Sequence, residues 1–177
     1  MTLDAAHPEF VPRRCWVSVG SNVERETSIR DGMDDLRDAY GALVVSTVYE
    51  TEAVGFDGDA FYNLVIGIRS PQTVAEIRRM LRAIEERRGR LRAAEKFAPR
   101  TLDLDLLTWG DAVGVIDGYE LPRDEILKYA FVLAPLADVA LAFGSAEEFA
   151  LVLLAFTTFV GLGGDDVLKT IIMICLG

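Results

Sequence analysis

The sequence contains few of the residues on which many catalytic and structural sites depend. Its 177 residues include one histidine, His7, and two cysteines, Cys15 and Cys175. A disulfide framework or a cysteine-rich zinc site is therefore excluded, and a mechanism with histidine as general base is not expected. Residues 1–14 form a loose leader without the apolar run of a secretory signal, so we expect a cytoplasmic protein in a reducing compartment.

Several recognisable motifs are also missing. The sequence has no Gly-x-x-x-x-Gly-Lys-Ser/Thr loop and no Gly-x-Gly-x-x-Gly after its first predicted strand. These absences exclude a P-loop and a dinucleotide-binding fingerprint. The uncharged stretch Phe149–Gly164 has sixteen residues, fewer than the roughly 20 that a membrane-spanning helix needs. We expect it to form a buried or interface helix.

Positive charge is scarce overall but concentrated in one segment. The formal net charge is −10, yet residues 78–100 contain nine basic and three acidic residues. An acidic surface disfavours nucleic acid and anionic membranes as partners. The basic segment therefore suits a compact polyanionic ligand, although a solvated helix face would have the same composition.

Hydrophobic periodicity predicts an alternation of strands and helices. Strands are expected at 15–20, 43–51, 61–68 and 102–109, and helices at 25–40, about 73–89 and 129–140. Thr73 followed by Glu76 predicts a capping box at the start of the second helix. This order favours an α+β fold, a ferredoxin-like sandwich whose mainly antiparallel sheet is packed with helices, in one domain spanning residues 15–177.

Asp103 and Asp105 are the strongest candidates for chemistry. Because alternate side chains of a strand share a face, both carboxylates should point outward while the intervening leucines enter the core. Such oxygen ligands suit Mg²⁺, which combines one or two carboxylates with waters and phosphate oxygens. Arg90, Arg92 and Arg100 precede them and could neutralise phosphates. On its own, Asp-x-Asp could equally be a solvated strand edge.

The run from Arg90 to Leu107, with Pro99-Arg-Thr-Leu-Asp-Leu-Asp105 at its centre, resembles the signature of the 6-hydroxymethyl-7,8-dihydropterin pyrophosphokinase family. Further matches occur in the family's order over about residues 15–140. They are Ser18-Val-Gly-Ser-Asn22, Val48-Tyr-Glu-Thr51 with Val54-Gly55, Phe61-Tyr-Asn63, and Leu121-Pro122 followed by Ala130–Leu136. The resemblance implies a ferredoxin-like enzyme of folate biosynthesis, which transfers pyrophosphate from ATP to the hydroxymethyl group of the pterin and releases AMP.

The resemblance also implies residue roles. Asp103 and Asp105 would hold two Mg²⁺ ions, and Arg90, Arg92 and Arg100 would bind the phosphates of ATP. Glu85 and Leu106 would contribute to the nucleotide site. The pterin would contact five residues: Thr51, Val54, Phe61, Asn63 and Phe131. Its ring would stack between the two phenylalanines.

Some positions depart from the family pattern. Arg123 and Asp124 replace a His-Tyr-type pair, and Tyr129 stands where an arginine is usual. Arg123 and Lys128 are close enough in sequence to compensate. The apolar tail, residues 146–177, is atypical and could mediate a homo-oligomer. Two alternatives therefore stay open: a nucleotide- or pterin-binding protein with weakened transfer, and a ferredoxin-like regulatory domain that assembles through its tail.

Overall fold

A computed structural model describes residues 11–53, 58–89 and 101–143 of the chain. Contacts between residues divide the chain into two units, residues 1–139 and residues 140–177, and the description below concerns the first. The elements, in chain order, are β1 (Arg13–Ser21), α1 (Arg25–Tyr40), β2 (Val44–Val45), β3 (Tyr49–Thr51), β4 (Phe61–Ser70), α2 (Val74–Arg87), β5 (Asp103–Trp109), β6 (Gly114–Ile116), β7 (Tyr119–Leu121), α3 (Glu125–Lys128) and α4 (Ala130–Phe143).

The main sheet has five strands, and every pairing in it is antiparallel. Its order is β2-β4-β1-β5. The short strand β3 pairs with the same edge of β4 as β2 does, nearer to the start of β4. The long strand β1 is central: Gly20 lies opposite Asn63 of β4 on one side and Asp103 of β5 on the other. A separate hairpin, β6–β7, follows β5. The predicted α+β sandwich with a mainly antiparallel sheet is therefore confirmed.

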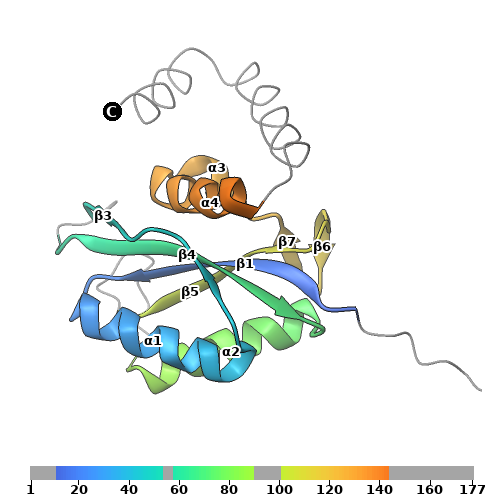
Figure 1. The fold of residues 1–177 in the computed structure, drawn as a ribbon, viewed down its shortest axis with the longest axis horizontal. Coiled ribbons are helices and arrows are strands. Elements are labelled where there is room, and N and C mark those ends of the chain that lie inside the picture. Colours follow the sequence, from blue (N-terminus) through green and yellow to red (C-terminus); the bar gives the residue numbers. More distant parts are fainter. Residues whose placement is uncertain (1–10, 54–57, 90–100, 144–177) are drawn as a thin grey trace, which may run out of the picture. The chain divides into compact units, whose positions relative to one another are not determined.

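The two faces of the sheet pack differently. On one face α1 and α2 cover a core of aliphatic side chains that includes Val17, Leu36, Ile66, Leu81 and Leu104. On the other face α3 and α4 pack over a smaller cluster, whose buried members are Val65, Leu107, Val132 and Val139 (Figure 1). The strand period of two assigns alternate residues of β1, β4 and β5 to these two faces.

The local signals in the sequence locate most elements correctly. The first helix spans the residues expected, and Thr73 and Glu76 form the predicted capping box at the start of α2. The predicted strand 43–51 is interrupted: the Ser46 hydroxyl accepts a hydrogen bond from the Val65 amide at 2.9 Å, between β2 and β3. β1 begins at Arg13, two residues earlier than expected.

Candidate active site

Asp103 and Asp105 lie on the face of β5 opposite the main core. Leu102, Leu104 and Leu106 are buried in the core beneath α1 and α2, whereas Asp103 is partly exposed and Asp105 is exposed. The strand alternation therefore places both carboxylates on one side. Along a strand they are roughly 6.5 Å apart, a separation at which two carboxylates repel by about 2.5 kcal/mol at a dielectric near 20. A bound cation would reverse that repulsion.

The candidate pterin residues are in register with the carboxylate strand. Asn63 and Asp103 flank Gly20 in one row across three strands. An ideal Cβ on Gly20 would lie 3.1 Å from Asn63 Oδ1 and 4.0 Å from Asp103 Cβ. Because position 20 has no side chain, the polar groups of β4 and β5 approach the backbone of β1 closely.

Asn63 and Thr51 are joined directly. Asn63 Nδ2 donates a hydrogen bond to Thr51 Oγ1 at 2.8 Å, which links β4 to β3. Phe61 faces Thr51 in the strand pairing and is partly buried. The fold thus brings together three of the five predicted pterin residues, while Val54 lies outside the described residues.

Phe131, at the start of α4, packs against the smaller cluster that α3 and α4 form on the second face of the sheet. Its ring stacks on Tyr129, with centroids 5.0 Å apart and planes 17° from parallel. Tyr49 Oη donates to Asp138 Oδ2 at 2.9 Å, so α4 is also tied to β3. Tyr129, which replaces an expected arginine, therefore contributes an aromatic surface next to the predicted pterin residue.

Two residues that the resemblance assigns to the nucleotide are buried. Glu85 is 3% exposed, and its Oε1 accepts a hydrogen bond from the Leu104 amide at 2.9 Å. Leu106 is 1% exposed, and its side chain packs in the main core. The backbone oxygen of Leu106 accepts a hydrogen bond from Tyr119 Oη at 3.2 Å. Glu85 thus binds the backbone of β5, and Leu106 anchors the same strand in the main core, on the side opposite the two carboxylates.

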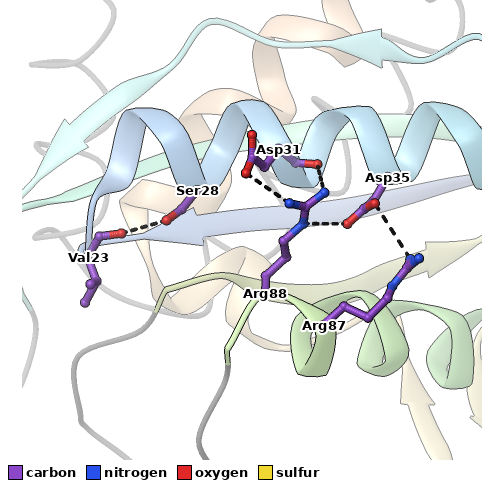
Figure 2. Close-up of polar contacts among 6 residues, drawn as sticks. All are labelled: Val23, Ser28, Asp31, Asp35, Arg87 and Arg88. Carbon is purple, nitrogen blue, oxygen red and sulfur yellow. Dashed lines mark hydrogen bonds and ion pairs between the residues drawn. The ribbon is translucent and has the colours of Figure 1, made fainter.

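The end of α2 is fixed to α1 immediately before the arginine-containing segment. Arg88 binds Asp35 and Asp31 of α1, at 2.7 and 2.9 Å, and Arg87 lies 3.9 Å from Asp35 (Figure 2). The three predicted phosphate ligands, Arg90, Arg92 and Arg100, fall outside the described residues. The structure therefore defines where this segment begins, at Gly89, and where it returns, before β5.

Arg123 is a cation next to the carboxylate strand. It follows the cis peptide Leu121–Pro122, and its amide donates to the Leu107 oxygen at 2.9 Å. Burial alone would lower the pKa of Arg123, but Tyr119 and Glu125, with a smaller contribution from Asp105, raise it above its ordinary value.

Two guanidinium groups lie over the ring of Tyr119 in this region. Arg78 lies 3.9 Å and Arg123 4.8 Å from its centroid. Burial, with a contribution from the charge of Asp105, raises the pKa of Tyr119 to about 12. Lys128, the other residue considered as a replacement cation, pairs with Asp124, and Arg123 pairs with Glu125. Of these two, Arg123 is the one that lies near a predicted metal ligand.

The available donors fit a magnesium ion better than a metal held entirely by protein. Within residues 11–53, 58–89 and 101–143, no three acidic, histidine or cysteine side chains form a metal-binding cluster. Two carboxylates on one strand face would suit Mg²⁺, which is usually held by one or two carboxylates together with waters and phosphate oxygens.

Comparison with known proteins identifies relatives of residues 16–141, which include all the candidate site residues. The family model described as 7,8-dihydro-6-hydroxymethylpterin-pyrophosphokinase matches residues 16–141. The 2-amino-4-hydroxy-6-hydroxymethyldihydropteridine pyrophosphokinase of Bacillus subtilis is 32% identical over 128 residues, which are 70% of this chain and 76% of that enzyme. The enzymes of the same name from Synechocystis and Pseudomonas aeruginosa are 31% and 32% identical and cover 75% and 72% of the chain, and 71% and 81% of their own lengths.

The C-terminal part is similar to another family. Residues 126–177 match the family model described as tripartite tricarboxylate transporter TctA family, and residues 126–141 match both models. In the part of the chain that the structure describes, no helix has the length and apolar character needed to cross a membrane. The first match ends where the sequence resemblance ends, near residue 140. Since it covers well over half of the chain, the protein belongs to the 7,8-dihydro-6-hydroxymethylpterin-pyrophosphokinase family.

Proposed function

We propose that this pyrophosphokinase of folate biosynthesis carries out its reaction on the sheet face formed by β3, β4, β1 and β5. ATP and 6-hydroxymethyl-7,8-dihydropterin are the substrates of the family. In the reaction, the hydroxymethyl oxygen bonds to the β-phosphorus of ATP and loses its proton. The bond from that phosphorus to the α,β-bridging oxygen breaks, and AMP leaves.

The carboxylates of Asp103 and Asp105 are proposed to hold magnesium at the nucleotide end of this face. When bound, Mg²⁺ would neutralise the charge of the triphosphate and align its oxygens. Arg90, Arg92 and Arg100 are the proposed phosphate-binding arginines, on the basis of their place in the family signature. Arg123 is proposed as a further cation beside this site, because its backbone amide is hydrogen-bonded to Leu107 of β5, the strand that carries both aspartates.

The opposite end of the row is proposed to bind the pterin. Asn63 and Thr51 carry the hydrogen-bonding groups, and Phe61 and Phe131 provide aromatic surfaces for a flat heterocycle. Val54 is included only from the family resemblance. In this arrangement Gly20 lies between the pterin residues and Asp103, so the acceptor alcohol and the phosphates meet over the central strand.

The observation that carries the proposal is the placement of both carboxylates on one face of β5, in register with Asn63. Asp103→Asn and Asp105→Asn should each reduce AMP formation by about 10²-fold or more, because a charge that stabilises the transition state is lost. Asp111→Asn, an exposed neighbour in the turn after β5, is the matched control and should retain activity. The metal assignment is wrong if a folded Asp103→Asn protein keeps its normal rate and magnesium dependence.

The assay of AMP formation also tests the alternative that the protein binds its ligands but transfers pyrophosphate only weakly. A protein that binds ATP and the pterin, measured by calorimetry, but forms no AMP with Mg²⁺ would fit that alternative. This alternative is suggested by Arg123, Asp124 and Tyr129, the three positions that depart from the family pattern. Self-association through residues 146–177, cytoplasmic location and a single domain over 15–177 remain predictions. Sedimentation at several concentrations, with and without the tail, would test the first.

A further inference from the structure

Glu85 combines two features that disfavour a charged carboxylate. Its side chain is 3% exposed, and it lies in the last turn of α2, where the helix dipole presents its negative end. Removing a carboxylate from water costs several kcal/mol unless hydrogen bonds or opposite charges offset the loss. A carboxylate at this position therefore indicates a specific role.

The hydrogen bond of Glu85 reaches the backbone between the two candidate metal ligands. Leu104 separates Asp103 from Asp105, and its amide donates to Glu85 Oε1 at 2.9 Å. β5 is the terminal strand in the order β2-β4-β1-β5. Glu85 thus supplies an acceptor at the outer edge of β5, where a further strand would otherwise supply one.

Buried side chains surround this contact. Ile84, next to Glu85, and Leu104 are both buried in the main core, at 0% and 5% exposure. One turn of α2 therefore packs against β5 and also binds its backbone. The bond fixes the peptide unit that joins Asp103 to Leu104, and so limits the directions in which the neighbouring carboxylates can point.

We infer that Glu85 is a positioning residue that holds Asp103 and Asp105 at the separation required for magnesium. The inference rests on the proposed metal role of these two aspartates. It gives Glu85 an indirect part in catalysis, through the Leu104 amide, in place of the nucleotide contact that the family resemblance implies.

Two variants separate this role from a role of the negative charge itself. Glu85→Gln keeps the length and the acceptor oxygen but removes the charge, whereas Glu85→Asp keeps the charge and is too short to reach Leu104 unchanged. The measurement is the Mg²⁺ concentration that gives half-maximal AMP formation. Glu85→Asp should raise it about tenfold or more, as loss of groups that orient metal ligands commonly does, and Glu85→Gln should stay within about twofold.

The opposite ranking would overturn the inference, because a charge-dependent role tolerates aspartate better than glutamine. If Glu85→Asp fails to fold, a folded Glu85→Gln protein still decides: an unchanged magnesium requirement supports the inference, and a raised one contradicts it. Glu120→Asp and Glu120→Gln, at an exposed position of β7, are the controls and should leave the magnesium requirement unchanged.

Binding of the pterin provides an independent readout. Its dissociation constant, followed by pterin fluorescence, should be unchanged in both Glu85 variants, whereas general damage to the sheet would weaken it. If Asp103→Asn leaves the magnesium requirement unchanged, the proposed metal site itself is wrong. If Asp103→Asn abolishes turnover while Glu85→Asp behaves as the unmodified protein does, only the role of Glu85 is refuted.

Discussion

Replacing Arg88 by alanine removes the contacts that hold the end of α2 against α1. Arg88 Nε donates to Asp35 Oδ2 at 2.7 Å, and Nη1 donates to Asp31 Oδ2 at 2.9 Å (Figure 2). A third bond, from Nη2 to the backbone oxygen of Asp31, is 3.2 Å long. Gly89 follows directly, so this cluster fixes the point at which the predicted phosphate-binding segment leaves the helix.

The magnitude follows from the exposure of the three side chains. Arg88 is 30% exposed, Asp35 14% and Asp31 43%, so the cluster is neither fully solvated nor fully buried. Hydrogen bonds to charged groups contribute about 1.5–3 kcal/mol, whereas fully exposed ion pairs contribute less than about 1 kcal/mol. We therefore expect Arg88→Ala to lower the free energy of unfolding by about 2 kcal/mol, and Arg88→Lys, which keeps one charged donor, by about 1 kcal/mol.

Urea unfolding at neutral pH measures this loss. Arg37→Ala is the matched control, because Arg37 pairs with Asp34 on the same helix α1 while both side chains are more than half exposed. Its loss should stay below about 0.5 kcal/mol. If Arg88→Ala costs no more than Arg37→Ala, the cluster does not anchor α2 and the reasoning from partial burial fails.

The pH dependence supplies a second check on the same cluster. The hydrogen bond from Arg88 holds the pKa of Asp35 below its ordinary value of 3.8. A carboxyl with a lowered folded-state pKa adds stability above its unfolded pKa and loses it as the pH falls through the folded value. The difference between the unmodified protein and Arg88→Ala should therefore be constant from neutral pH to about pH 5 and shrink below about pH 4.

Three further outcomes can be measured independently. Burial raises the pKa of Cys15 to about 11, so a Cys175→Ser protein should resist iodoacetamide at about pH 8 until it is unfolded; rapid labelling of the native protein would contradict this. Arg123→Gln should raise the KM for ATP about tenfold without changing pterin affinity, whereas an equal effect on both ligands would refute a phosphate role. Thr51→Val removes the acceptor of the Asn63 amide and should weaken pterin binding about tenfold in a fluorescence titration, with ATP affinity unchanged.

The long helices α1 and α2 and the carboxylate face were predictable because their signals are local, whereas the four-residue helix α3 was not expected. The apolar spacing of Ile29, Met33 and Leu36 sets the buried face of α1, and all three are in the main core. Alternation of leucine and aspartate along β5 likewise requires only the period of a strand. Neither inference depends on a contact between distant parts of the chain.

The features that were missed depend on short segments or on tertiary contacts. Asp117 and Gly118, both with positive φ, form the turn of the β6–β7 hairpin, and Asp-Gly is a known hairpin signal. Its strands have three residues each, too few for a periodic pattern. The bond between Ser46 and Val65, which accompanies the break between β2 and β3, joins residues 19 positions apart and has no local signature.

The role of Glu85 shows why site residues are harder to predict than strands. In the sequence it is one of two adjacent glutamates within a basic segment, and only the family resemblance singles it out, for a contact with the nucleotide and not with β5. The structure separates them, since Glu85 is buried against β5 and Glu86 is exposed. Because β5 carries core leucines on one face and the candidate metal ligands on the other, changes in the packing of α2 against β5 should affect stability and activity together. Changes at Arg88, whose side chain binds Asp31 and Asp35 of α1, should act on activity only through the start of the predicted phosphate-binding segment and leave the magnesium requirement unchanged, so the two kinds of variant can be told apart.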